Sequence, residues 1–168
     1  MIPKVIHYCW FGGNPKPEII ESCIASWRKF CPDWEIIEWN ENNFDVRRYT
    51  FMSEAYDAGK WAFVSDVARL MIIYEYGGIY LDTDVELRMS LEQVSRFNAF
   101  FAYDNLVNIN TGIGFGAVPE HPYIQAMLES YADQHFDAHH VVACPKLNTD
   151  ALRSCCPDWV VNGNETQC

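Results

Sequence analysis

The sequence has few positive charges, and this limits the partners it can have. Lys and Arg total 12 against 23 Asp and Glu, which gives a formal net charge of −11. Such a balance argues against nucleic acid or an anionic membrane surface as the main partner. If the substrate carries phosphate, a bound cation has to supply the missing positive charge.

The sequence also shows no export signal and no long apolar run. The opening MIPKVIHYCWFGG has one lysine and a short, interrupted apolar stretch, unlike a signal peptide. No segment approaches the roughly 18 apolar residues of a membrane-spanning helix. The seven cysteines form no CxxC pair, so we expect free thiols in a cytoplasmic protein. A zinc site is the alternative for the irregularly spaced Cys144, Cys155, Cys156 and Cys168.

Internal repeats, low-complexity segments and an obvious interdomain linker are absent too. The 168 residues suit one domain large enough to bury a core. Aromatic residues make up 15% of the chain, which argues against disorder and provides flat surfaces on which bases and sugars can stack. We therefore expect residues 1–168 to form a single domain.

Strands and helices alternate along this domain. Strands are expected at 3–10, 34–39, 79–82, 97–103 and 111–118, helices at 17–30, 62–76 and 122–136, and a candidate strand at 158–161. The alternation predicts an α/β fold. In an open α/β sheet, ligands bind at the carboxyl ends of the strands.

Three carboxylates crowd the segment GGIYLDTDVE, residues 77–86. The glycine pair predicts that a helix ends there and turns at once into a strand. Residues two apart on a strand point the same way, so Tyr80, Asp82 and Asp84 are expected to share a side. Two such carboxylates after a buried strand are typical of a Mg²⁺ or Mn²⁺ site. A solvated acidic loop is the alternative, and Glu86 is expected to lie outside the pair.

Asp66 and Arg69 stand three residues apart on the predicted helix 62–76 and can form an ion pair. Because that helix runs directly into the strand that precedes Asp82, both side chains can reach the same cleft. There Asp66 could accept hydrogen bonds from sugar hydroxyls, and Arg69 could donate to hydroxyls or phosphate oxygens. An exposed surface ion pair is the alternative.

The segment WAFVSDVARLMIIYEYGGIYLDTDVE, residues 61–86, resembles the sugar-nucleotide-binding signature of glycosyltransferases with the DXD motif. It is most similar to glycosyltransferase family 32, which includes capsular-polysaccharide and mannosyl transferases, and its core pattern recurs in glucosylating clostridial toxins. The opening IPKVIHYCWFGG, residues 2–13, is similar to the first strand of these enzymes. NTGIGFGAVPEHP, residues 110–122, fits a later strand more loosely.

This resemblance implies a GT-A fold, which is a Rossmann-like sheet flanked by helices, and a hexosyltransferase that retains the donor's anomeric configuration without a covalent nucleophile. Carried over by position, it implies that Trp10 stacks on the nucleotide base and that Tyr80 lies beside the nucleotide. A place in the core is the alternative for each, and Ile6, Tyr8 and Trp10 are expected to share one face of the first strand. Asp66 and Arg69 would hold hydroxyls of the donor sugar and take part in catalysis.

The resemblance also implies a metal site and a substrate class. Asp82 would contact ribose and the metal's water shell, while Asp84 would bind Mn²⁺ or Mg²⁺ directly and so serve catalysis. The favoured donor is a UDP-sugar, with a GDP-sugar as the other option. The acceptor would be a glycan or a lipid-linked saccharide, as in capsular-polysaccharide synthesis. Asn108, Asn110 and Thr111 are candidate sugar or acceptor contacts, with ordinary turn residues as the alternative.

Family members continue with a segment that bears a late His near the metal and a Trp near the acceptor. This sequence stops after Asp158-Trp159-Val160-Val161 and a polar tail, so we expect an abbreviated C-terminus. Asp137, His139 and His140 are candidate replacements, with a solvated helix end as the alternative. A nucleotide-sugar-binding domain without turnover is therefore an alternative function.

A phosphatase of the haloacid-dehalogenase type is a further alternative. Asp82-Thr83-Asp84 approximates the opening of its motif, with Asp82 as nucleophile and Asp84 as acid. That motif normally has Thr or Val where Glu86 stands, and it normally follows an N-terminal strand. The two enzymes differ in product, because a phosphatase hydrolyses p-nitrophenyl phosphate whereas a transferase releases UDP or GDP.

Overall fold

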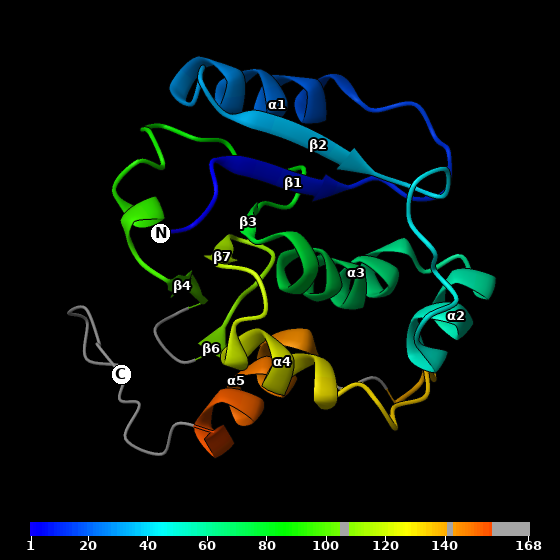
Figure 1. Cartoon of the computed structure of the whole chain (residues 1–168). Helices are drawn as coiled ribbons and strands as arrows, with labels where there is room; N and C mark the ends of the chain where they lie inside the picture. The colour runs from blue at the N-terminus through cyan, green and yellow to red at the C-terminus, as the bar shows by residue number, and fades with distance from the viewer. Residues whose placement is uncertain (105–107, 141–142, 156–168) are drawn as a thin grey trace.

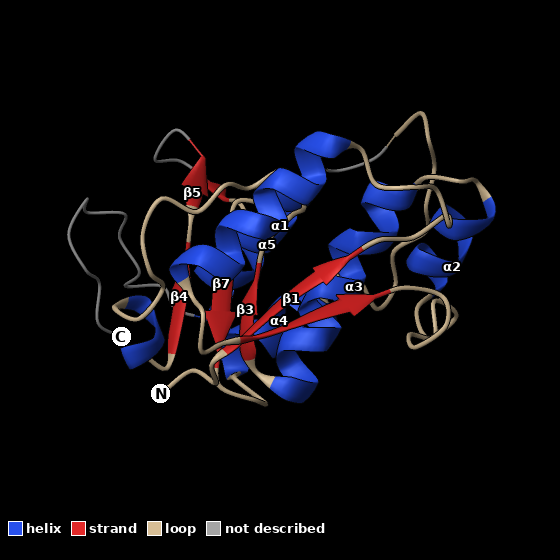
Figure 2. Ribbon diagram, turned by 90° about the horizontal axis from the view of Figure 1, so that it is seen from above, coloured by secondary structure: helices blue, strands red, loops and turns tan. Residues whose placement is uncertain are grey.

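A mixed five-stranded sheet forms the centre of the protein (Figures 1 and 2). The computed structural model describes residues 1–104, 108–140 and 143–155. The strand order is β2-β1-β3-β7-β4, made of β1 (Val5–Cys9), β2 (Glu35–Trp39), β3 (Gly78–Tyr80), β4 (Ala99–Phe101) and β7 (Phe115–Ala117). β1 pairs in parallel with β2 and β3, whereas β7 runs antiparallel to β3 and β4. A small antiparallel ladder joins β5 (Tyr103–Asp104) to β6 (Asn108–Ile109).

Helices cover both faces of the sheet. Figure 1 shows α1 on one side and α3, α4 and α5 on the other. The helices are α1 (Glu18–Phe30), α2 (Thr50–Asp57), α3 (Trp61–Tyr76), α4 (Pro122–Glu129) and α5 (Cys144–Cys155), with a 3₁₀ turn at Val94–Arg96. The predicted α/β class is therefore confirmed. No described helix is both long and apolar enough to cross a membrane.

The alternation of side chains along β1 separates two apolar cores. Ile6 and Tyr8 pack with Trp27 of α1 in one core. Cys9 belongs to the other core, which includes Val67 of α3. Side chains two apart on a strand share a face, so β1 contributes side chains to the apolar cores on both faces of the sheet.

His7 fixes the turn that leads from α3 into β3. Its Nδ1 accepts a hydrogen bond from Trp39 Nε1 at 3.0 Å, which leaves Nε2–H to donate to Gly77 O at 3.0 Å. Gly78 has φ +98°, and a Cβ there would lie 2.8 Å from both His7 Nε2 and Val5 O. Only glycine therefore allows β3 to approach β1 so closely. The predicted role of the glycine pair is confirmed.

Four expected elements differ from the structure. The strand predicted at 97–103 is divided into β4, Ala99–Phe101, in the main sheet and β5, Tyr103–Asp104, in the small ladder. The strand predicted at 111–118 covers only Phe115–Ala117, because Asn110 Oδ1 accepts from Gly112 N–H and closes a turn. The helix predicted at 122–136 ends at Glu129, where the Ser130 hydroxyl donates to Met127 O. The strand predicted at 79–82 ends at Tyr80. The candidate strand at 158–161 lies outside the described residues.

α2, β6 and α5 were not expected from the sequence. In α5 the buried side chains are Cys144, Asn148, Thr149 and Leu152, so most of its buried positions are polar or weakly apolar. The buried positions recur at helical spacing, but few of them are the large apolar residues by which a sequence pattern reveals a helix.

Candidate nucleotide-sugar site

A cavity of about 470 Å³ opens where β1 and β3 end and α3 begins. Its size is typical of small-molecule sites. Its walls come from the end of β1 and the following loop, one stripe of α3, and the segment after β3: Cys9, Trp10, Phe11, Asn14, Pro15, Pro17, Ile20, Trp61, Ala62, Ser65, Arg69, Tyr80, Asp82, Thr83 and Asp84. Five of the six residues expected at the site from the sequence line this cavity.

Asp82 is held by contacts from three sides. Its backbone N–H donates to Gly112 O at 3.0 Å. One carboxylate oxygen accepts from the Tyr80 hydroxyl at 3.1 Å, and the other lies 3.4 Å from Arg69 Nη1. Burial and nearby acidic groups raise the pKa of Tyr80 well above its usual value, so Tyr80 remains a hydrogen-bond donor. Asp82 is therefore oriented before any ligand binds.

Asp84 lies on the turn that follows β3, because Val85 N–H donates to Asp82 O at 3.1 Å. The expected strand alternation does not reach Asp84, since the strand ends at Tyr80. Asp84 is exposed, and it nevertheless lines the same cavity as Asp82. Glu86 pairs with Arg88 and is not among the lining residues, in line with the expectation that it lies outside the pair.

The chemistry of these carboxylates fits a hard divalent cation. Among the residues that the structure describes, no group of three His, Cys, Asp or Glu side chains is placed to hold a metal. Asp82 and Asp84, which line one cavity, would supply the protein's oxygen ligands. Mg²⁺ is commonly bound in this way, by one or two carboxylates together with substrate phosphates and water.

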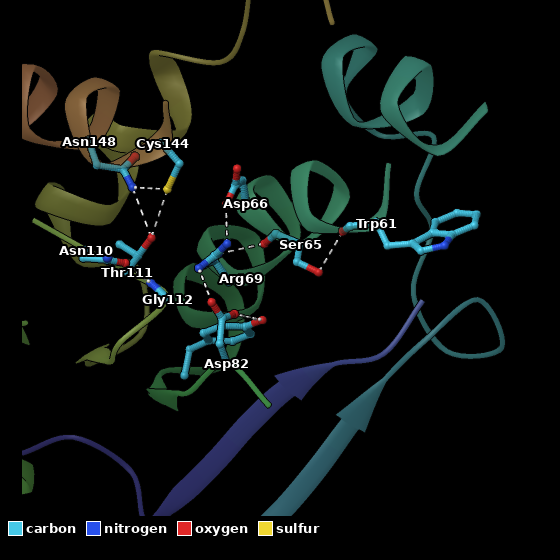
Figure 3. A network of polar contacts seen from close by, with 11 residues as sticks. Trp61, Ser65, Asp66, Arg69, Asp82, Asn110, Thr111, Gly112, Cys144 and Asn148 are labelled. Carbon is cyan, nitrogen blue, oxygen red and sulfur yellow. Dashed lines mark hydrogen bonds and ion pairs between the residues drawn. The ribbon is translucent and has the colours of Figure 1, made fainter. Parts of the chain in front are cut away.

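Arg69 lies between Asp66 and Asp82, as Figure 3 shows. Its side chain is 5% exposed, Nη2 pairs with Asp66 Oδ1, and Nε donates to Ser65 O at 3.0 Å. The alternative of an exposed surface ion pair is therefore wrong. Burial alone would lower the pKa of Arg69, but the charges of Asp66 and Asp82 outweigh it and hold this pKa well above its usual value.

Asp66 is the one expected site residue that does not line the cavity. Burial raises the pKa of Asp66, and the positive charge of Arg69 opposes that effect. The Cys144 thiol is a further hydrogen-bond partner of Asp66. Asp66 is thus paired with Arg69 from its own helix and with a polar group from α5.

The start of α5 forms a polar network behind Asp66 (Figure 3). Cys144 Sγ lies 3.4 Å from Thr111 Oγ1, and Asn148 Nδ2 donates to both atoms. Burial raises the pKa of Cys144 to about 12, so its thiol stays protonated. This placement beside Asp66 argues against Cys144 as a zinc ligand. Sequence reasoning missed the network because it missed α5.

Trp10 is fixed at the edge of the cavity. Its Nε1–H donates to Asn14 O at 2.7 Å. The Lys16 ammonium lies 5.7 Å from the centre of the Trp10 ring and 2.6 Å from Glu38 Oε2. Trp10 is half-buried and lines the cavity. A ring held by an edge hydrogen bond and a nearby cation is a preset surface for stacking.

The residues considered as replacements for a late histidine lie elsewhere. Asp137, His139 and His140 are exposed, and His140 Nδ1 lies 3.0 Å from Asp137 Oδ2. None of them lines the cavity. The solvated-turn alternative therefore describes them better.

Comparison with known proteins agrees with the geometry of this cavity. Residues 17–101 match the family described as glycosyltransferase sugar-binding region containing DXD motif. The chain belongs to this family. The matched region contains the Asp66–Arg69 pair and the Asp82/Asp84 motif of the DXD glycosyltransferases. This assignment decides against the haloacid-dehalogenase alternative.

Relatives of this DXD glycosyltransferase chain are similar over most of its length. Inositol phosphoceramide mannosyltransferase 2 of Schizosaccharomyces pombe is 28% identical over 134 residues, which is 77% of this chain and 38% of that protein. The human alpha-1,4-N-acetylglucosaminyltransferase is 37% identical over 92 residues, 55% of this chain and 26% of that protein. The chain thus spans at most about two fifths of the length of these curated relatives.

A solved structure shares the fold. The PaToxG glycosyltransferase superposes with a TM-score of 0.70 over 93% of this chain and 70% of that chain, at 18% sequence identity. The expected GT-A-type architecture is therefore confirmed at the level of the fold.

Proposed function

We propose that the protein is a metal-dependent glycosyltransferase that moves a sugar from a nucleotide-sugar donor to a hydroxyl of a glycan or lipid-linked saccharide. The observation that carries the proposal is that Asp82 and Asp84 share one cavity with Trp10. The aromatic ring suits the base, and the carboxylates suit a cation bound to the diphosphate. We propose a UDP-sugar as the favoured donor and a GDP-sugar as the second option. We also propose that the reaction belongs to capsular-polysaccharide or glycoconjugate synthesis.

In this proposal Asp82 and Asp84 hold Mn²⁺ or Mg²⁺. When bound, the cation would neutralise charge on the leaving diphosphate. Tyr80 and Arg69 keep the Asp82 carboxylate in its orientation. The protein has a formal net charge of −11, so a cation is needed before the cavity can attract a diphosphate.

Asp66 and Arg69 are proposed to orient the donor sugar. Arg69 reaches the cavity wall directly. Asp66 is 12% exposed at its side chain, so it would meet a sugar hydroxyl only at the inner end of the site. Fixing donor and acceptor in one geometry is a large part of what such an enzyme contributes to rate.

We propose that the reaction retains the anomeric configuration of the donor without a covalent enzyme intermediate. Within the described part of the chain, Asp82 and Asp84 are the carboxylates that line the cavity. Both are assigned to the cation, which leaves no other lining carboxylate for nucleophilic attack. The leaving diphosphate and the incoming hydroxyl would then occupy the same face of the sugar.

Two further points complete the proposal. We propose that residues 1–168 form one domain, and the shared sheet on which both apolar cores of the described residues pack supports this. We also propose the cytoplasm as the compartment, which the free thiols of Cys9, Cys23, Cys31 and Cys144 support.

The proposal is tested by a thermal-shift screen of UDP-, GDP- and CDP-sugars with and without Mn²⁺, followed by measurement of nucleotide release. We expect a rise in Tm that requires both a nucleotide sugar and Mn²⁺, because a ligand that binds the folded state stabilises it. The Asp84→Asn variant should fold normally and lose that rise. A metal-independent rise, or no rise with any donor, contradicts the proposal.

A further inference from the structure

One stripe of α3 runs along the wall of the cavity. Trp61, Ser65 and Arg69 follow one another at intervals of four residues, and all three line the cavity (Figure 3). At 1.5 Å per residue, Trp61 stands about 12 Å along the helix axis from Arg69. Because Arg69 contacts Asp82, the stripe has a carboxylate-bearing end and an aromatic end.

This spacing matches the shape of a nucleoside diphosphate. With its diphosphate at the level of Arg69 and Asp82, an extended nucleotide would place its base near Trp61. The loop after β1 brings Trp10, Pro15 and Pro17 to the same cavity. The residues at this end are mainly apolar or aromatic, whereas the charged lining residues are Arg69 and the Asp82/Asp84 pair.

Trp61 is held in place before a ligand arrives. The Tyr56 ring meets it edge-on, with centroids 5.2 Å apart and planes at 66°. Gly12 packs so closely that a Cβ there would lie 2.5 Å from Trp61 Cε2. Glu41 Oε1 accepts from Gly12 N–H at 2.6 Å and from the Tyr56 hydroxyl at 3.4 Å. Glu41 therefore links the two neighbours that fix the indole.

We propose that Trp61 is the second aromatic surface of the base site beside Trp10, and that it contributes more to purine than to pyrimidine binding. This inference rests on the proposed function. Stacking is sequence-tolerant because every base has a π-face. A two-ring purine covers more of an indole than a one-ring pyrimidine, so loss of Trp61 removes more contact from GDP than from UDP.

Calorimetric titration of GDP and UDP in the presence of Mn²⁺ tests the inference. Trp61→Ala should weaken GDP binding about 5- to 150-fold, the range of base stacking on an aromatic residue, and should weaken UDP binding by a smaller factor. Trp61→Phe keeps a ring and should recover most of the loss. Phe63→Leu is the matched control, because Phe63 lies on the same helix, packs on Phe51 and Phe136, and does not line the cavity.

Gly12→Ala provides a second variant that retains the indole. Its methyl group should displace Trp61 and lower GDP affinity more than UDP affinity, whereas the backbone strain of an alanine at φ +88° is the same with either nucleotide. Unchanged GDP and UDP affinities in folded Trp61→Ala would contradict the role of Trp61 as a second stacking surface. Equal losses of GDP and UDP affinity would contradict its larger contribution to purine binding. If the unmodified protein binds neither nucleotide, the proposed function itself fails, so the two failures are distinguishable.

Discussion

Arg69 Nη1 lies 3.4 Å from Asp82 Oδ2, which joins α3 directly to the turn that carries the Asp-x-Asp pair. The same guanidinium pairs with Asp66 and stands 5.3 Å above the Tyr80 ring. One buried cation thus connects the acidic residue proposed for the sugar with the one proposed for the metal. Its loss should affect folding and binding together.

Replacement of Arg69 by methionine should destabilise the fold by about 3–5 kcal/mol, because it leaves the buried Asp66 carboxylate without its partner. Urea unfolding measures this change. The double variant Arg69→Met/Asp66→Leu should recover much of the loss, since it removes both buried charges. A single variant as stable as the unmodified protein would show that the pair is not buried in solution.

Asp84→Asn should abolish Mn²⁺-dependent donor binding and leave the unfolding midpoint almost unchanged, because Asp84 is exposed on a turn. Isothermal titration with a UDP-sugar and Mn²⁺ checks this. Glu86→Gln removes a charge two residues away and serves as the control, since Glu86 does not line the cavity. Equal losses in both variants would point to general electrostatics instead of a metal ligand.

Gly112→Ala should disturb Asp82 without requiring an unusual backbone conformation. A Cβ at Gly112 would overlap Asp82 Oδ2 and lie 3.0 Å from Arg69 Nη1. We expect Mn²⁺-dependent nucleotide affinity to fall at least about tenfold, or 1.4 kcal/mol, with a smaller loss of stability. Normal affinity in this variant would mean that the observed orientation of Asp82 is not required.

Trp10→Ala should weaken nucleotide binding by roughly 1–3 kcal/mol if the indole stacks on the base, as aromatic residues do in nucleic-acid complexes. Trp10→Phe should retain a large part of the affinity. Calorimetric titration reports the loss, and urea unfolding separates it from stability. A pure stability loss with normal affinity would assign Trp10 to the core.

His7 should make the protein less stable in mild acid. Burial lowers its pKa to about 4, although its hydrogen bond to Gly77 O opposes this. Above the unfolded pKa of about 6.5 both states are neutral at this ring. As the pH falls below that value the unfolded state takes up a proton and the folded state does not. Stability is therefore lost down to about pH 4, in total by about 3 kcal/mol.

Urea unfolding at pH 7 and pH 5 measures the effect of His7, for which we expect a loss of about 2 kcal/mol at pH 5. His7→Gln should remove this part of the pH dependence. His121, whose pKa is also lowered by burial, provides the control variant His121→Gln, which should leave the His7 contribution in place. An unchanged pH profile in His7→Gln would contradict the assignment.

Much of the site could be predicted because its residues lie on elements with strong local sequence signals. The α3 helix and the glycine pair place Arg69 and Asp82 close together, and both signals are local in the sequence. The alternation along β1 likewise predicted that Trp10 follows Ile6 and Tyr8 on one face, and these three residues meet in the α1-side core.

The remaining features depend on contacts that local patterns do not encode. Asp66 contacts Cys144, a residue on a helix whose buried positions include the polar Asn148 and Thr149. The role of Trp61 depends on the close approach of Gly12, which belongs to a loop far away in the sequence. The predicted strand alternation does not apply to Asp84, because β3 ends at Tyr80 and the chain then turns.

The hydrogen bond between His7 and Gly77 O spans 70 residues, and the α5 network behind Asp66 requires a segment that is made later still. During synthesis, β1 therefore cannot pair with β3, the central strand of its sheet, until β3 has been made. Long-range pairing of this kind slows folding and leaves strand edges exposed in the meantime. The nascent chain should consequently depend on chaperones until α5 has left the ribosome, and it should acquire the ability to bind nucleotide in one late step.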